Sequence, residues 1–304
     1  MPPVGGTLTT STGEGQSGLF SATRGAYAYP MTRRSILVTG CSSGIGLASA
    51  RLLHSRGWHV LATARRAEDL DRLAAEGLTP LHLELADADS VARCAATALE
   101  AADGRVDALF NNAAFGQPGA VEDIRGDVLR HQFEVNVIGT HELTRLLLPA
   151  MRRAGWGRIV NCSSVLGLVA APWRGAYSAS KFALEGLSDA LRLELTGSGI
   201  HVSLIEPGPI RTRFIENAMA AARAHVDIAG SVHAATYQRV IAGMERGGKQ
   251  FFKLEPEAVA AKLQHAVESR RPKTRYYVTT PTYVAAYLKR LLPDRLMDVL
   301  AARG

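Results

Sequence analysis

A tyrosine and a lysine four residues apart, in the stretch YSASK from Tyr177 to Lys181, could carry out acid–base chemistry. The apolar spacing over 175–196 predicts a helix, on which the two side chains share one face. A free tyrosine has a pKa of about 10 and exchanges protons poorly at neutral pH. Because a nearby ammonium stabilises the phenolate, we expect Lys181 to lower this pKa and Tyr177 to act as a general acid or base.

A glycine-rich stretch, TGCSSGIG, stands between a strand predicted over 36–39 and a helix predicted over 45–56. Gly40 permits a tight turn, Gly44 leaves room for a ligand at the backbone, and Gly46 lets the helix pack closely on the strand. The N–H groups of the first helical turn then favour an anion, which we expect to be a pyrophosphate. Its expected contacts come from Gly40, Ser42, Ser43, Gly44, Ile45 and Gly46. The spacing GxxxGxG differs from the fingerprint GxGxxG, and no P-loop lysine follows, so a turn without a ligand is the alternative.

The elements that must position these residues alternate between strands and helices. Strands are predicted over 36–39, 59–63, 80–85, 106–110, 157–162, 200–207 and 274–279. Helices are predicted over 45–56, 67–76, 89–102, much of 127–153, 175–196 and 256–268. This order predicts an α/β fold, a doubly wound parallel sheet of the Rossmann type in a single domain. Ligands of such folds bind at the carboxyl ends of the strands.

Composition and charge exclude several classes of protein. The 304 residues are 47% hydrophobic and 21% charged, an ordinary balance for a globular domain. The net charge is +7, and eight Lys and Arg against three Asp and Glu place +5 of it in residues 268–304. Acidic residues interleave with the basic ones, so we expect a solvated surface and no nucleic-acid partner. No apolar run reaches the roughly 18 residues that a membrane span needs, so no transmembrane segment is expected.

Cysteine and histidine are not spaced for metal or disulfide chemistry. Cys41, Cys94 and Cys162 lie far apart with no CxxC pair, and the histidines lack HxxxH or HExxH spacing. We therefore expect no metal site and a reducing, cytoplasmic location. Residues 1–31 are rich in Gly, Ser and Thr, and we expect a disordered extension there, with Met31 as an alternative start.

Six motifs occur in order along the chain. They are TGCSSGIG (39–46), NNAA (111–114), VNVIG (135–139), NCSS (161–164), YSASK (177–181) and EPGPIRT (206–212). Together they resemble the short-chain dehydrogenase/reductase family, over about Ser35 to Val278. TGCSSGIG and the strand end VLATARR are similar to the hydroxysteroid and retinol dehydrogenase branch. The resemblance implies a catalytic domain over 32–280, with a helical segment over 281–304.

The resemblance implies four catalytic residues, Asn136, Ser164, Tyr177 and Lys181. Ser164 would hold and polarise a substrate carbonyl, with Ser163 as the alternative for that role. Asn136 would hold a water that links Lys181 to solvent, although an asparagine inside a helix can instead bond the backbone. Tyr177 and Lys181 would also bind the nicotinamide ribose of the cofactor.

The end of the second strand distinguishes NADP from NAD. A Rossmann-type fold that prefers NAD has an acidic residue there, which binds the ribose 2′-hydroxyl. In this chain Ala64 stands at that position, and Arg65 and Arg66 follow. Because guanidinium groups pair well with phosphate, we expect NADP rather than NAD, and Arg65 rather than Arg66 as the better contact.

The resemblance implies the remaining cofactor contacts as well. From the adenine end to the nicotinamide end they are Glu84, Leu85, Asn112, Ala113, Pro207, Gly208, Ile210 and Thr212. Glu84 is one methylene longer than the aspartate that the family has at the adenine. The Thr212 hydroxyl could instead cap the following helix. Asn111 is expected to stabilise the central sheet.

The function that these residues imply is an NADP-dependent oxidoreductase that interconverts a lipophilic ketone or aldehyde and its alcohol. A substrate lid is expected over about 211–250, carrying Met219, Tyr237 and Met244, although ordinary helix packing explains the same residues. The alternative function is a catalytically silent NAD(P)-binding protein with a regulatory or redox-sensing role.

The long helices of the chain bear on its oligomeric state. The helices near 127–153 and 175–196 build the dimer interface of the family, so the resemblance implies a homodimer or homotetramer. The basic, amphipathic stretch 282–303 could lie on a membrane surface, on the lid or on another subunit.

Overall fold

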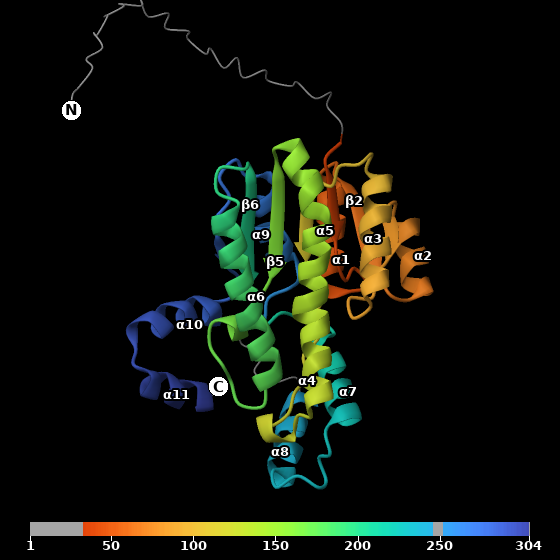
Figure 1. Ribbon diagram of the computed structural model, residues 1–304. Coiled ribbons are helices and arrows are strands. Elements are labelled where there is room, and N and C mark those ends of the chain that lie inside the picture. The colour runs from red at the N-terminus through yellow and green to blue at the C-terminus, as the bar shows by residue number, and fades with distance from the viewer. Residues whose placement is uncertain (1–32, 246–251, 304) are drawn as a thin grey trace, which may run out of the picture. The chain divides into compact units, whose positions relative to one another are not determined.

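Parallel strands form one sheet at the centre of this computed structural model, which describes residues 33–245 and 252–303 (Figure 1). In this part of the chain the strand order is β3-β2-β1-β4-β5-β6-β7, and every neighbouring pair is parallel. The strands are β1 Ser35–Val38, β2 His59–Ala64, β3 Thr79–His82, β4 Ala108–Asn111, β5 Gly157–Cys162, β6 Ile200–Glu206 and β7 Arg275–Tyr277. The doubly wound Rossmann-type fold is therefore confirmed. The order reverses between β1 and β4, and ligands bind at this point in such folds.

Helices cover both faces of the sheet (Figure 1). They are α1 Gly44–Ser55, α2 Ala67–Ala75, α3 Ala88–Ala101, α4 Gly126–Phe133, α5 Gly139–Ala154, α6 Gly175–Glu194, α7 Phe214–His225, α8 Ala234–Glu245, α9 Glu257–Glu268, α10 Thr280–Leu291 and α11 Asp294–Arg303. Three short helical turns join them, η1 Val121–Asp123, η2 Glu134–Ile138 and η3 Val165–Gly167. The expected extension over 1–31 lies outside the described residues.

Each face of the sheet has its own hydrophobic core. Ile36 of β1 points to one face, where Leu53 of α1 and Leu263 of α9 are fully buried. Its neighbour Leu37 points to the other face, where it packs with Leu147 of α5. Successive side chains of a strand alternate between faces, so a strand covered on both sides is apolar throughout. This explains why short runs such as SILV could be identified as strands.

The helix predicted over much of 127–153 is in fact interrupted. A π-helical turn, η2, separates α4 from α5, and Asn136 lies inside it. The Asn136 amide bonds the main chain of Phe115, and a Cβ on Gly139 would lie 2.1 Å from the Leu85 carbonyl oxygen. These tertiary contacts accompany the change of helical register, and the apolar period of a sequence does not reveal them.

Two strands end earlier than predicted. β3 stops at His82, and beyond it the Glu84 N–H donates to the Ser90 hydroxyl at 2.9 Å rather than to a strand. β7 stops at Tyr277, because the Thr279 carbonyl already accepts N–H groups from the first turn of α10. In both places a short apolar run continues past the last hydrogen bond of the strand. The run alone therefore predicts a strand that is too long.

The segment after β7 forms two helices rather than one. Pro293 follows the end of α10, and α11 begins at Asp294. α10 packs against η3, the turn that follows Ser164, while Tyr287 and Leu291 stay exposed. The C-terminal helices thus extend from the side of the sheet that β7 closes (Figure 1).

Candidate active site

The glycine-rich turn between β1 and α1 is built on close backbone contacts. Gly40 and Gly44 have φ angles of +74° and +57°, which L side chains rarely adopt. A Cβ on Gly46 would lie 2.1 Å from the Gly40 carbonyl oxygen, and one on Gly44 would lie 2.9 Å from Thr212 Cγ2. The turn therefore requires glycine at all three positions, and it brings the loop containing Thr212 against the start of α1.

The start of α1 fits the pyrophosphate of a dinucleotide. Among the described residues, no side chain caps this helix, because Ser43 at its N-cap makes no capping bond and its first turn holds no acid. The first N–H groups of a helix lack intrahelical partners and favour an anion. These groups belong to Gly44, Ile45 and Gly46, with the half-buried Ser42 and Ser43 beside them.

Tyr177 lies buried in the first turn of α6. Burial raises the pKa of its phenol, whereas a hydrogen bond with the Ser164 hydroxyl and the charge of Arg174 lower it. The Phe214 ring lies 5.3 Å from the Tyr177 ring, centre to centre, and covers one side of it. Burial is the largest influence on this pKa, which is raised, and the expected lowering by Lys181 stays a prediction.

Lys181 lies one turn further along α6 and is 3% exposed. Its ammonium donates to the Cys162 carbonyl at 2.8 Å and lies 5.7 Å from the centre of the Tyr177 ring. Burial lowers the pKa of Lys181, while the nearby Glu185 carboxyl group raises it. The helical spacing thus places Tyr177 and Lys181 on one face, and the ammonium points to the strand end beside the phenol.

The two neighbouring serines face different surroundings. The Ser164 hydroxyl caps η3 by accepting the Leu166 N–H at 3.1 Å, and it bonds Tyr177. The Ser163 hydroxyl instead lies beside Gly167, where a Cβ would stand 2.5 Å from it. Of the two candidates, the structure therefore brings Ser164 to the phenol and directs Ser163 away from it.

Asn136 bonds the backbone from within η2. Its amide accepts the Phe115 N–H at 3.1 Å and donates to the Phe115 carbonyl at 2.9 Å and to the Ser180 hydroxyl at 3.1 Å. The side chain is 1% exposed. This is the backbone-bonding alternative of the sequence analysis, and a water between Asn136 and Lys181 stays a prediction.

The residues expected at the adenine end lie after β2 and β3. Arg65 and Glu84 form an ion pair of 3.4 Å between Nη1 and Oε2, and the Arg65 side chain is 72% exposed. Arg66 instead pairs with Glu68 and Asp69 at the start of α2. The structure thus leaves Arg65 at the surface beside Glu84, while Arg66 is engaged by its own helix.

Three further adenine-side positions serve the fold directly. Leu85 is buried in the core on the α5 side of the sheet, so only its backbone could meet a ligand. The Asn112 amide donates to the Thr39 carbonyl at 2.9 Å, and the Ala113 N–H donates to the Thr39 hydroxyl at 2.9 Å. These bonds hold the end of β4 against the glycine turn.

Asn111, at the last position of β4, ties the strand to its neighbour. Its amide donates to the Asn161 side-chain oxygen of β5 at 2.8 Å and to the Thr144 hydroxyl of α5 at 3.0 Å. All three groups are buried. The expected role of Asn111 in the central sheet agrees with these bonds.

The loop after β6 packs tightly against its surroundings. The Pro207 carbonyl accepts the Val165 N–H at 2.8 Å, which joins this loop to the turn after Ser164. A Cβ on Gly208 would lie 2.0 Å from the Thr279 hydroxyl, so only glycine fits between the loop and α10. Ile210 pairs with Leu254 in an isolated parallel bridge. The Thr212 hydroxyl accepts the Phe214 N–H at 3.3 Å, but the N-cap of α7 is Arg213 rather than Thr212.

Two of the three residues expected in the lid, Met219 and Tyr237, take part in packing. Met219 is buried, and the Tyr237 hydroxyl accepts the Ala120 N–H at 2.7 Å and donates to Asp123 at 2.8 Å. The side chain of Met244 lies outside the described residues. The residue that does cover the site from this segment is Phe214, which the sequence analysis did not single out.

Two further neighbours of the site were missed from sequence. Arg174 stands three residues before Tyr177, a spacing that places both on one side of the α6 start, and this could have been noticed. Gly116 lies under the Phe214 ring, where a Cβ would come within 2.9 Å of Phe214 Cζ. No local pattern marks Gly116, because its partner is far away in the sequence.

Residues 33–245 and 252–303 hold neither a candidate metal cluster nor a candidate membrane span. In these ranges no three His, Cys, Asp or Glu residues gather in a way that could hold a metal ion. Nor does any helix there combine the length and apolar character needed to cross a membrane.

Comparisons with known proteins agree with this geometry. A family model described as short chain dehydrogenase matches residues 34–223. An uncharacterised oxidoreductase, YbbO of Escherichia coli (strain K12), is 46% identical over 266 residues, which are 88% of this chain and 93% of the relative. Human 17-beta-hydroxysteroid dehydrogenase type 1 is 37% identical over 82% of this chain and 78% of its own.

Solved structures share the fold. A short chain dehydrogenase/reductase from Burkholderia phymatum, solved in complex with NAD, has a TM-score of 0.71 and is 28% identical. The match covers 86% of this chain and 94% of that one. The chain therefore belongs to the short-chain dehydrogenase/reductase family. Within this class it is an oxidoreductase that acts on CH–OH and C=O groups.

Proposed function

We propose that the protein is an NADP-dependent oxidoreductase that interconverts a lipophilic ketone or aldehyde and its alcohol. The observation that carries this proposal is the buried Tyr177 phenol, bonded to Ser164 and adjacent to Lys181, at the sheet edge where the glycine turn fits a dinucleotide. A bound nicotinamide would supply or accept the hydride. The residues of the chain then have to handle the proton and the carbonyl oxygen.

Tyr177 is proposed as the general acid in reduction and the general base in oxidation. Because burial raises its pKa, the phenol keeps its proton at neutral pH, which suits proton donation to a carbonyl oxygen. The Ser164 hydroxyl, already bonded to the phenol, would hold the same oxygen. Lys181 would favour the phenolate that forms when the proton leaves.

Arg65 supports a preference for NADP over NAD. Ala64 ends β2 without an acidic group, and the exposed Arg65 follows it. A guanidinium pairs well with a 2′-phosphate. Arg65 would then exchange its ion pair with Glu84 for a contact with that phosphate. Arg66 is the weaker candidate, since Glu68 and Asp69 already hold it. The structural relative from Burkholderia phymatum was solved with NAD, so the cofactor has to be tested directly.

A lipophilic substrate is proposed from the surroundings of Tyr177. Phe214, at the start of α7, is an apolar ring in contact with the phenol. We propose that α7 and α8 form the lid over the substrate, within the expected range 211–250. Phe214 is then the side chain through which the lid meets the substrate.

A homodimer or homotetramer is proposed from exposed apolar side chains on neighbouring elements. α6 packs against α4 and η2, and these elements expose Leu129, Ile138, Phe182 and Leu193. A cytoplasmic location is proposed because Cys41, Cys94 and Cys162 are all free thiols, which fits a reducing compartment.

The cofactor assignment is tested by fluorescence titration with NADPH and, separately, NADH. We expect the wild type to bind NADPH more tightly, and Arg65→Asp to lose about tenfold or more in NADPH affinity and to favour NADH. Arg66→Asp is the matched control with the same charge change, and its NADPH affinity should fall much less. Equal binding of both cofactors by the wild type, or an equal loss in both variants, would overturn the role of Arg65.

The silent alternative is tested by the same titration followed by turnover. A protein that binds NADPH but reduces no ketone or aldehyde would support a regulatory or redox-sensing role. A protein that binds neither cofactor would contradict both functions.

A further inference from the structure

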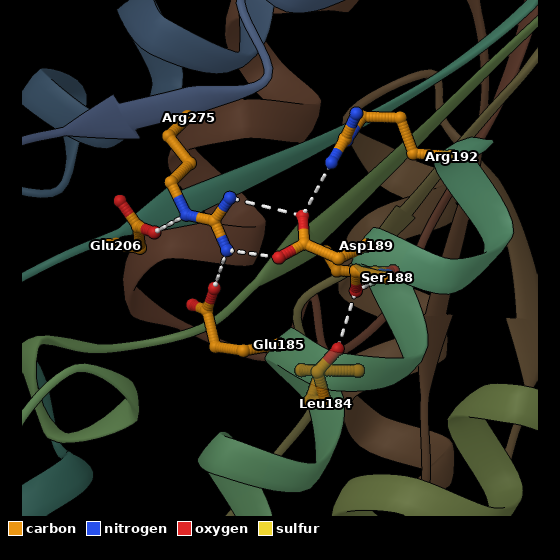
Figure 2. Close-up of polar contacts among 8 residues, drawn as sticks. Leu184, Glu185, Ser188, Asp189, Arg192, Glu206 and Arg275 are labelled. Atoms are coloured by element: carbon orange, nitrogen blue, oxygen red, sulfur yellow. Dashed lines mark hydrogen bonds and ion pairs between the residues drawn. The ribbon is translucent and has the colours of Figure 1, made fainter.

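Arg275 of β7 contacts three acidic side chains, those of Glu185, Asp189 and Glu206 (Figure 2). Its guanidinium donates to Glu185 at 2.8 Å and to both oxygens of Asp189 at 2.8 and 3.0 Å. Its Nε lies 3.1 Å from Glu206 Oε1. Arg192 also donates to Asp189, at 3.1 Å. Glu185 and Asp189 belong to α6, so this cluster ties the last strand of the sheet to the helix that carries Tyr177 and Lys181.

Glu185 is the member of the cluster that reaches toward the active site. It stands one helical turn after Lys181 on the same face of α6, and the two side chains are 7% and 3% exposed. One of its oxygens, Oε2, is held by Arg275. The other, Oε1, lies beside Gly167, where a Cβ would stand 3.3 Å from it and 2.5 Å from the Ser163 hydroxyl. Glu185 is thus fixed between Arg275 and the turn that presents Ser164.

The charges of this region indicate that Glu185, one helical turn from Lys181, is the ionised member of the buried pair Glu185 and Glu206. Glu206 is fully buried, and burial together with Glu185 raises its pKa to about 9, so it keeps its proton at neutral pH. Burial also raises the pKa of Glu185, but the Ser163 hydroxyl and Arg275 lower it. Arg275 contacts both carboxyl groups, at 2.8 Å for Glu185 and 3.1 Å for Glu206, and because Glu206 keeps its proton we assign the negative charge of the pair to Glu185.

Lys181 needs such a partner. Its ammonium has one hydrogen bond in the described structure, to the neutral Cys162 carbonyl, and burial disfavours its charge. We propose that Glu185 is a positioning residue, which keeps the Lys181 ammonium charged beside Tyr177. The inference rests on the proposed function, because it matters to catalysis only if Lys181 acts on Tyr177. Arg275 holds Glu185 in place, so β7 contributes to the site without touching it.

Several other groups titrate or carry charge near these two residues. Those facing Glu185 and its partner Glu206 are Ser163, Asp189, Arg192, Arg275 and Tyr277, and those facing Lys181 are Cys162 and Tyr177. Asp189 shares Arg275 with Glu185 but stands a further turn away from Lys181. Asp189→Asn is therefore a control, because it removes one carboxylate from the same Arg275 guanidinium.

The test follows the titration of Lys181 directly by NMR. The chain has six lysines, so a lysine-labelled sample gives few signals, and Lys181→Arg identifies the one required. We expect Glu185→Gln to move the Lys181 midpoint to lower pH and Asp189→Asn to leave it unchanged. Glu185→Asp, which retracts the carboxylate by one methylene, should lie between wild type and Glu185→Gln and serves if the latter does not fold. An unchanged midpoint in both Glu185 variants, or an equal shift in Asp189→Asn, would overturn the proposal.

A pH profile of alcohol oxidation separates an electrostatic role from a structural one. With Lys181 less charged, the Tyr177 phenolate is harder to form, so the rising limb of kcat/KM should move to higher pH in Glu185→Gln. The loss should be about tenfold near neutral pH and should shrink as pH rises. A loss of the same size at every pH would contradict the proposal. If the wild type oxidises no alcohol, the proposed function fails, while the NMR titration still decides the interaction of Glu185 with Lys181.

Discussion

At the scale of residues, burial outweighs the local charges in this site. Tyr177 and Lys181 are both almost fully buried, and burial pushes each toward its neutral form. Ser164 and Arg174 act on the phenol, and Glu185 acts on the ammonium. A neutral phenol can donate a proton, so we predict that the protein catalyses carbonyl reduction near neutral pH. Alcohol oxidation should need a higher pH.

Glu206 gives a prediction for stability. The folded chain holds its proton up to about pH 9, whereas an unfolded glutamate releases it near the ordinary value of 4.5. The folded state therefore binds more protons in this window, and its contribution to stability falls as pH rises through it. Glu206→Gln cannot ionise and should be more stable than wild type by several degrees in Tm at about pH 8, and by less at about pH 5. Thermal unfolding followed by circular dichroism at the two pH values checks this, and an equal difference at both would contradict it.

At the scale of elements, the meeting of β1 and α1 leaves no room for a side chain. A Cβ on Gly46 would overlap the Gly40 carbonyl oxygen. This oxygen belongs to the backbone, so it cannot move aside as a flexible side chain could. Helix α1 also packs against α9 and the core, so it cannot shift without losing buried contacts. The glycine turn is therefore required for the fold as well as for a ligand.

Gly46→Ala should lower the free energy of unfolding by about 3 kcal/mol, because the methyl group overlaps the Gly40 carbonyl. Gly243→Ala, in the last turn of α8, is the matched control, since no described atom lies within 4 Å of its Cβ position. That variant should stay within about 1 kcal/mol of wild type, with alanine the better helix former. Urea unfolding of both variants measures the difference. Equal effects would show that helix propensity, not the close contact, decides the outcome.

The elements also show what a single sequence can reveal. Strands such as SILV are apolar throughout because both faces are covered, so their positions were predictable. The pair Ser163 and Ser164 could not be separated by composition, because only the packing at Gly167 directs one hydroxyl away. The π turn around Asn136 and the contact of Arg275 with Glu206 depend on partners far away in the sequence. Local periodicity carries no information about such contacts.

At the scale of the whole molecule, one sheet brings the candidate residues together at its carboxyl edge. β1, β4, β5 and β6 all end there, followed by the glycine turn, Asn112, Ser164 and Pro207. The family resemblance identified most of these positions, because motif order reports strand order in this fold. The contact of Phe214 with Tyr177 could not be predicted in this way, and the two expected lid residues Met219 and Tyr237 are buried in α7 and α8.

The exposed apolar side chains of α4, η2 and α6 predict self-association. Wild type should elute with a mass of two or four times 32.5 kDa, measured by light scattering after size-exclusion chromatography. Phe182→Asp should shift this mass toward the monomer, because a charge on a buried interface is costly. Val232→Asp places the same charge on a residue that is 87% exposed between α7 and α8, and it should leave the mass unchanged. A monomeric wild type would contradict the proposed assembly.

The most direct test of the proposed chemistry is the rate of NADPH consumption with a lipophilic ketone, compared between wild type and Tyr177→Phe. The variant removes only the phenolic hydroxyl and keeps the ring against Phe214, so fold and NADPH binding should persist. We predict turnover by wild type and a loss of roughly 10²- to 10⁴-fold in kcat in the variant, with a much smaller fall in NADPH affinity. Turnover by Tyr177→Phe at the wild-type rate would contradict the assignment of Tyr177 as the proton donor.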